Sequence, residues 1–125
     1  MKIDVKLEAF EGPLDLLLHL IEKNKVNIYD IPIVEITNQY MEYIQEMERS
    51  ASMESMSEFL VMAEAVLRIK SRMLLPKEEK EEEEDPREEL VQRLVEYKMC
   101  RYAAEELKDL SVDAEKVFYK PETIP

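Results

Sequence analysis

Few side chains in this sequence have the type and spacing that catalysis or metal binding requires. His19 is the only histidine and Cys100 the only cysteine, so the Cys/His spacing of a zinc site is absent. A lone histidine on the polar edge of a helix is expected to be a surface residue rather than a base or a ligand. Gly12, the only glycine, cannot form a glycine-rich phosphate-binding loop by itself. The sequence therefore predicts no enzymatic activity, no cofactor and no metal site.

The densest cluster of charged groups is the run 77–85, which holds seven acidic residues around Lys80. Carboxylates can bind divalent cations, but this run has no glycine turn that would fix the geometry of its ligands. Like charges at this density repel one another, and the run contains no apolar side chain that could pack. We therefore expect a solvated linker between an N-terminal helical domain over 1–76 and a helix with a tail over 86–125.

Composition indicates the class of fold and restricts the class of partner. The 125 residues are 46% hydrophobic with a single glycine, and the apolar residues recur at helical spacing, which favours an all-α protein. The net charge of −12 disfavours direct binding to nucleic acid or to an anionic membrane, although an acidic mimic of nucleic acid stays open as an alternative. One cysteine, with no long apolar run and no signal pattern, predicts a cytoplasmic protein without a membrane span.

The first helix is expected from Pro13 to Lys23, because proline suits the first helical position. One apolar stripe of this helix consists of Leu14, Leu17, Leu18 and Ile21. Leu16 and Leu20 form a second stripe about 90° away from the first. A surface helix of a small monomer needs one stripe, so the second is a candidate contact with another helix or another chain.

The segments on either side of this helix also carry a periodic pattern. Before it, apolar side chains alternate with charged ones in the manner of a short half-buried strand: Ile3, Val5, Leu7 and Ala9. The partner of this strand would be the run 117–119 or a strand of another molecule. After it, Asp30 and Pro32 mark the start of a second helix that is expected to end near Glu48.

The third helix carries two apolar seams side by side. Its N-cap is Ser55, with Glu58 completing a capping box, or the earlier Ser52, and Pro76 ends it. The first seam is Phe59, Met62, Val66, Ile69 and Met73, and the second, one residue on, is Leu60, Ala63, Leu67, Lys70 and Leu74. One seam can close the domain while the other meets a coiled coil from outside. We favour the first as the outward seam, because methionine adapts to a separately folded surface; the alternative is that both belong to the core.

The fourth helix is expected from Asp85, as N-cap, and Pro86 to about Leu110, followed by an irregular tail from Ser111 to Pro125. Its apolar residues line two sides of the helix: Leu90, Leu94, Tyr97 and Ala104 on one, Val91, Val95, Met99 and Tyr102 on the other. Because the acidic linker separates this helix from the first domain, its tyrosines are candidate interface anchors. The alternative is that the linker allows the helix to fold back onto the bundle.

Several long segments in the same order resemble the bacterial kleisin family of segregation and condensation protein A. They are VKLE (5–8), FEGPLDLLLHLI (10–21), IYDIP (28–32), EFLVMA (58–63), IKSRMLLP (69–76) and DPREELV (85–91). The resemblance covers nearly the whole chain. It implies a non-enzymatic condensin subunit that acts in chromosome condensation and segregation, in the cytoplasm and with the nucleoid.

The resemblance also implies the partners. The N-terminal helical domain would join the neck coiled coil of an SMC subunit, and the following segment would bind a dimer of segregation and condensation protein B, with DNA reached only through the complex. Candidate neck-binding residues are Leu16, Leu20, Phe59, Met62, Val66, Ile69 and Met73. Candidate residues for the second partner are Leu90, Leu94, Tyr97, Arg101, Tyr102, Phe118 and Tyr119. The family's C-terminal winged-helix domain would lie beyond Pro125, so only these two contacts are expected of this chain.

Overall fold

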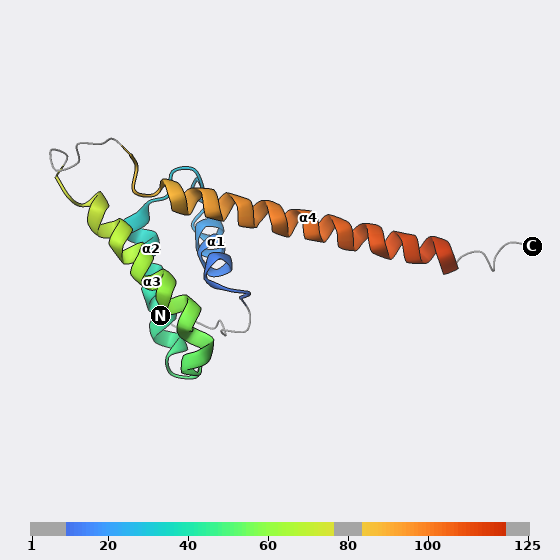
Figure 1. Ribbon diagram of the computed structural model, residues 1–125, viewed down its shortest axis with the longest axis horizontal. Coiled ribbons are helices and arrows are strands. Elements are labelled where there is room, and N and C mark those ends of the chain that lie inside the picture. The colour runs from blue at the N-terminus through green and yellow to red at the C-terminus, as the bar shows by residue number, and fades with distance from the viewer. Residues whose placement is uncertain (1–9, 77–83, 120–125) are drawn as a thin grey trace, which may run out of the picture.

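The computed structural model describes residues 10–76 and 84–119, with side chains up to residue 110. These residues form four α-helices, named in chain order: α1 (Pro13–Lys23), α2 (Ile33–Met47), α3 (Met53–Met73) and α4 (Glu88–Tyr119) (Figure 1). No strand occurs within the described ranges, and the all-α prediction is confirmed. The strand expected over residues 3–9 lies outside them.

Helix α1 lies at the centre of the bundle and contacts each of the other three helices. Its five central apolar side chains are at most 2% exposed: Leu16, Leu17, Leu18, Leu20 and Ile21. A helix that is apolar on most of its circumference needs neighbours on several sides. The second stripe, Leu16 and Leu20, is therefore covered by helices of the same chain. Gly12 precedes the helix with a φ of 155°, a conformation that side-chain-bearing residues rarely adopt, and Pro13 occupies the first turn.

Helices α2 and α3 form an antiparallel hairpin with the most extensive packing in the molecule. Ser52 is the N-cap of α3, and its hydroxyl accepts a hydrogen bond from the backbone N–H of Ser55 at 3.1 Å, so the earlier of the two expected caps is the one used. Between the helices, the buried Tyr40 donates its hydroxyl to the carbonyl oxygen of Phe59 at 2.8 Å. Burial raises the pKa of Tyr40 above its usual range.

Helix α4 differs from its expected bounds at both ends. It begins at Glu88, two residues after Pro86, because Asp85 Oδ1 accepts the backbone N–H of Arg87 and closes a turn before the helix. It also continues to Tyr119, so the irregular tail expected from Ser111 is wrong over residues 111–119. The sequence has no glycine or proline between Arg87 and Pro121, and nothing therefore interrupts the helix before that proline.

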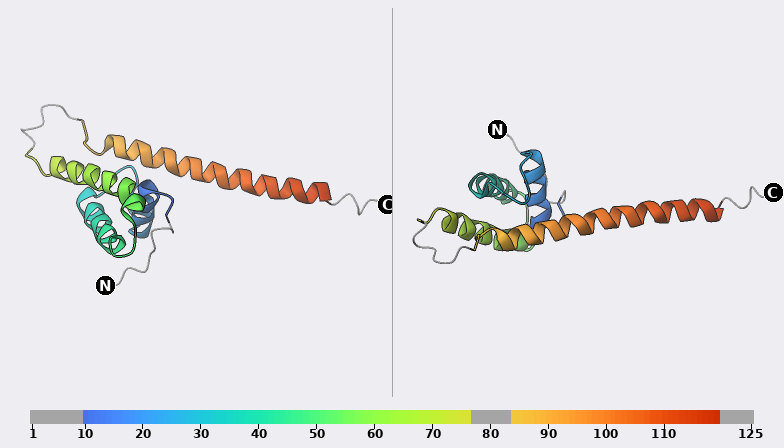
Figure 2. Two further views of the ribbon diagram at one scale, coloured as in Figure 1. Left: turned by 60° about the horizontal axis from the view of Figure 1, so that its bottom comes forward. Right: turned by 90° about the horizontal axis from the view of Figure 1, so that it is seen from above.

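The first part of α4 packs on α1, and the rest projects away from the bundle (Figures 1 and 2). Leu90 and Leu94 are at most 4% exposed and belong to the same core as α1, α2 and α3. All residues from Met99 to Leu110 are exposed. The first turns of the fourth helix thus fold back onto the bundle, as in the second of the two alternatives, and the turns after them extend into solvent.

Arg87 links the start of α4 to the connector between α1 and α2. Its guanidinium donates to Asp30 Oδ1 at 3.0 Å, to the carbonyl oxygen of Ile31 at 2.6 Å and to Asp85 Oδ2 at 2.7 Å. The hydrogen bond that Arg87 donates to the Asp85 carboxylate is the largest of the contributions that raise the pKa of Arg87 above its ordinary value. These bonds hold the start of α4 against the connector between α1 and α2.

Candidate partner-binding surfaces

The seam of α3 that we expected to face outward faces the core over most of its length. Phe59, Met62 and Val66 are at most 4% exposed, because α3 packs on α1 and α2 through this side. The expectation that this seam faces outward is therefore wrong for these three residues. Only Ile69 and Met73, in the last two turns of the helix, keep part of their surface exposed.

The exposed apolar side chains of α3 lie on the two flanks of this buried face. On one flank, Leu67 is 41% and Leu74 65% exposed, and both belong to the second predicted seam. On the other flank, about 120° around the helix from Leu67, Val61 is 69% exposed. Val61 was not predicted as a contact residue because it belongs to neither seam, although Val61, Ala65 and Ile69 follow one another at intervals of four and indicate a third apolar line.

Charge is segregated along α3. Its acidic residues, Glu54, Glu58 and Glu64, all precede its basic residues, Arg68, Lys70 and Arg72. Arg68 pairs with Glu64 one turn away, and Lys70 Nζ donates to Asn38 Oδ1 at 3.0 Å. Acidic groups near the N-terminus and basic groups near the C-terminus match the helix dipole. A helical partner lying along α3 would meet negative potential at one end and positive potential at the other.

Two polar contacts join α4 to the start of α1. Arg101 Nη1 lies 2.7 Å from Asp15 Oδ1, and the Tyr97 hydroxyl donates to Glu11 Oε1 at 3.3 Å. Asp15 Oδ2 also accepts the backbone N–H of Glu11 at 3.0 Å. Burial, with added contributions from the charges of Asp15 and Glu11, raises the pKa of Tyr97 to about 12. Tyr97 and Arg101 therefore hold α4 on the bundle here, whatever further contacts they make with a partner.

The remaining candidates for the second partner fall into three groups. Leu90 and Leu94 are buried in the core, while Tyr102 is 66% exposed on the projecting part of α4. Phe118 and Tyr119 lie in the last turns of α4, where only the backbone is described. The structure thus brings Leu90, Leu94, Tyr97 and Arg101 onto the bundle side of the helix and leaves Tyr102 on the extension.

The projecting part of α4 has an apolar stripe of its own. Met99, Ala103, Leu107 and Leu110 follow a 4-4-3 spacing and are all exposed. At 100° per residue, Leu110 lies about 160° around the helix axis from Leu94, so the stripe points away from the bundle. We call this set the distal stripe. Leu107 and Leu110 were not predicted as contact residues, because the two predicted apolar sides of this helix extend only to Tyr102 and Ala104.

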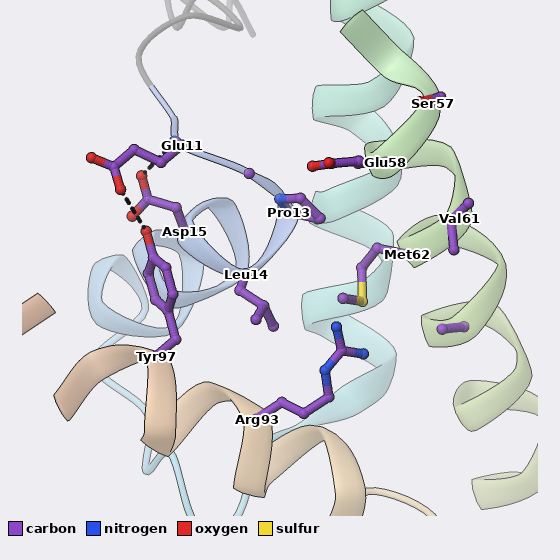
Figure 3. Close-up of a pocket in the computed structure, with 12 residues that line it drawn as sticks. Glu11, Pro13, Leu14, Asp15, Ser57, Glu58, Val61, Met62, Arg93 and Tyr97 are labelled. Carbon is purple, nitrogen blue, oxygen red and sulfur yellow. Dashed lines mark hydrogen bonds between the residues drawn. The ribbon is translucent and has the colours of Figure 1, made fainter. Parts of the chain in front are cut away.

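A cavity of about 430 Å³ lies where the start of α1 meets α3 and α4 (Figure 3). Its apolar lining includes Leu14, Val61 and Met62, and Glu58 and Arg93 bring opposite charges to it. Within residues 10–76 and 84–119, no group of three or more His, Cys, Asp or Glu residues could hold a metal ion. The same residues include no helix that is long and apolar enough to span a bilayer.

Fold and surfaces together define a class: a helical interaction module, with a closed core and apolar helix faces left open on two separate elements. Comparison with known proteins agrees with this class. Residues 20–124 match the family profile described as segregation and condensation protein ScpA. The chain belongs to the segregation and condensation protein A family.

Relatives with this name occur in several species. The chain is 52% identical to segregation and condensation protein A of Bacillus licheniformis, over 97% of this chain and 51% of that protein. It is 52% identical to the Bacillus subtilis protein, over 94% of this chain and 49% of that protein. It is also 52% identical to the Listeria innocua protein, over 97% of this chain and 51% of that protein. The chain spans about half the length of the curated relatives it matches.

Proposed function

We propose that this chain is part of a non-enzymatic kleisin subunit of the bacterial condensin, which acts in chromosome condensation and segregation. In this proposal it bridges the neck coiled coil of an SMC subunit and a dimer of segregation and condensation protein B. The observation that carries the proposal is the presence of exposed apolar helix faces on two elements that lie apart, α3 and the projecting part of α4. Family membership supports partners within the condensin complex, and the choice of these two partners is part of the proposal.

The N-terminal bundle would bind the neck through the exposed side chains of α3. Of the residues predicted for this contact, Ile69 and Met73 remain accessible, whereas the other five form the core that holds α3 in place: Leu16, Leu20, Phe59, Met62 and Val66. A partner can gain binding free energy only from surface that the free chain exposes. We therefore assign the direct contact to exposed flanks of α3 and a supporting role to these five residues.

The second partner would cover the distal stripe of α4. Most helical stability in proteins comes from tertiary packing, so the projecting segment would gain order from a partner that buries its apolar side. Full burial of Met99, Leu107 and Leu110 would contribute on the order of 1.5–3 kcal/mol each before the costs of association are subtracted. Tyr102 at the edge of the stripe, with Phe118 and Tyr119 farther along, completes the proposed contact.

The chain would reach DNA only through the complex, in the cytoplasm and with the nucleoid. Its net charge of −12 opposes direct contact with phosphate groups. Titration of the purified chain with an SMC neck fragment and with the dimer, separately and together, tests the bridging role. We expect binding to each partner, a ternary complex, and affinities that change little with added salt. Failure to bind either partner, or a steep salt dependence such as a nucleic-acid mimic would show, would contradict the proposal.

A further inference from the structure

Helix α4 is attached to the bundle along one side. The residues of this attachment are spaced by 3, 4, 3 and 4 positions, as in a helical seam: Arg87, Leu90, Leu94, Tyr97 and Arg101. Within the described part of the chain, α4 packs on α1 and has no comparable packing on α2 or α3. Of the buried apolar side chains described, only Leu90 and Leu94 come from α4. The attachment of α4 is therefore small beside the packing of the α2–α3 hairpin.

The first end of this attachment is held by several bonds at once. Arg87 donates hydrogen bonds of 2.6 to 3.0 Å to Asp30, to the carbonyl oxygen of Ile31 and to Asp85. Its side chain is only 17% exposed, so solvent screens these charge-assisted bonds little. Asp30 and Ile31 belong to the connector between α1 and α2. The start of α4 is thus anchored to a part of the chain other than α1 itself.

The second end is held more weakly. Arg101 donates to Asp15 Oδ1 at 2.7 Å, but its side chain is 46% exposed, and solvent therefore screens the pair. The Tyr97 hydroxyl reaches Glu11 Oε1 at 3.3 Å, which is longer than a typical O–H···O hydrogen bond (Figure 3). Beyond Arg101, the described side chains of α4 are exposed. The two ends of the attachment therefore differ in strength.

We propose that α4 is a latch, which opens at its Arg101 end and pivots at its Arg87 end while α1, α2 and α3 stay folded. In the open form Leu94, Tyr97 and Arg101 leave α1, whereas Arg87 keeps its bonds to the connector. Segments that bury few apolar side chains open at a lower free energy than the whole protein unfolds. Opening swings the projecting part of α4, and the distal stripe with it, relative to the bundle. For the proposed function, the two partner-binding surfaces then change their relative orientation without unfolding of the bundle.

Thiol labelling of single-cysteine variants tests the latch on the chain alone. In a Cys100→Ser background, Leu94→Cys reports opening of α4 and Val66→Cys reports unfolding of α3, since both wild-type side chains are fully buried. Each thiol reacts only in molecules that expose it, so its labelling rate follows the population of the open form. Leu94→Cys should label at least about tenfold faster than Val66→Cys. Circular dichroism checks that both variants fold, and equal labelling rates would overturn the proposal.

A substitution away from α4 separates local opening from unfolding of the whole chain. Tyr40→Phe removes the hydrogen bond from α2 to the carbonyl oxygen of Phe59, a contact that the open form keeps. It should raise the labelling rate of Val66→Cys about fivefold and change that of Leu94→Cys less than about twofold. An equal rise at both positions would show that α4 leaves α1 only when the whole chain unfolds, which would also overturn the proposal.

Two matched arginine substitutions identify the end at which α4 opens. Arg101→Gln removes a contact that only the closed form makes, so it should raise the labelling rate of Leu94→Cys about threefold. Arg87→Gln removes contacts that the closed and open forms share. It should therefore raise the labelling rate of Val66→Cys and leave that of Leu94→Cys within about twofold.

The outcomes of the arginine pair are decisive for the pivot. A rise at Leu94→Cys with Arg87→Gln, or none with Arg101→Gln, would overturn the assignment of the two ends. These measurements need no partner. A chain that binds neither proposed partner would contradict the proposed function and would leave the latch unaffected.

Discussion

Arg101 and Asp15 meet at 2.7 Å across 86 positions of sequence, and their contact fixes where α4 leaves the bundle. The Arg101 side chain is 46% exposed, whereas that of Asp15 is 12% exposed. Asp15 also accepts the backbone N–H of Glu11, so it stabilises the turn before α1 at the same time. One carboxylate thus supports both the start of the central helix and the attachment of the last helix.

The two partners of this contact should contribute unequally to stability. Asp15→Ala should lower the free energy of unfolding by about 1–3 kcal/mol, because it leaves a partly buried N–H and a guanidinium without their acceptor. Arg101→Ala should cost about 1 kcal/mol or less, since its side chain is half exposed and screened by solvent. Urea unfolding followed by circular dichroism measures both. Lys98→Ala, an exposed control on α4, should stay within about 0.5 kcal/mol of wild type; an equally neutral Asp15→Ala would contradict the expectation.

The buried and projecting parts of α4 should respond differently to the same substitution. Leu94→Ala should destabilise the protein by about 2–5 kcal/mol, because Leu94 is fully buried in the core. Leu107→Ala should change stability by no more than about 0.5 kcal/mol, since Leu107 is exposed. Denaturant titration of the two variants checks the difference. Equal effects would mean that the core does not include the first turns of α4.

Stability should fall at high pH, with part of the fall due to Tyr97. Its pKa is about 12 in the folded chain and about 10 in an unfolded one. Between these values the unfolded chain loses its proton first, so the folded state loses relative stability as the pH rises from 10 to 12. Urea midpoints at pH 8 and pH 11 should therefore differ less in Tyr97→Phe than in wild type. The difference between the two proteins is the informative quantity, because lysine side chains titrate in the same range.

The distal stripe should be needed for the second partner and dispensable for the first. A double variant, Leu107→Glu with Leu110→Glu, should lose most of its affinity for the segregation and condensation protein B dimer, because two carboxylates would be placed against an apolar contact. Binding to the SMC neck should stay within about twofold of wild type. Isothermal titration with each partner measures both affinities. As a matched control, Glu105→Gln with Asp109→Asn changes two charges outside the stripe and should leave both affinities in place.

Much of the local structure could be predicted from the sequence. Pro13 after the single glycine defines the start of α1, α2 lies where its apolar period and Pro32 predict, and α3 begins at its serine cap. These features depend on residues close to one another in the chain. The apolar period alone could not decide which of two adjacent seams on α3 faces the core. That choice depends on where α1 and α2 lie, which is a matter of tertiary packing.

The position of the first turns of α4 could not be predicted from the sequence. The acidic run suggested that the fourth helix stays apart from the bundle, yet Leu90 and Leu94 return to the core. Closing a loop of this size costs little more entropy than closing a shorter one, so a charged linker does not keep two apolar surfaces apart. The candidate surface for the second partner changes for the same reason. Tyr97, which was predicted to contact a partner, contacts Glu11 of the same chain, and the exposed apolar side chains lie farther along the helix.

The unbroken course of α4 from Leu94 to Leu110 sets a fixed spacing of about 24 Å between the bundle and the middle of the extension. It also sets a rotational phase. One inserted residue near Tyr102 would turn everything beyond it by about 100°, whereas three or four would nearly restore the original direction at a greater reach. Insertions of different length in this one helix can therefore change its reach and the orientation of its far end separately.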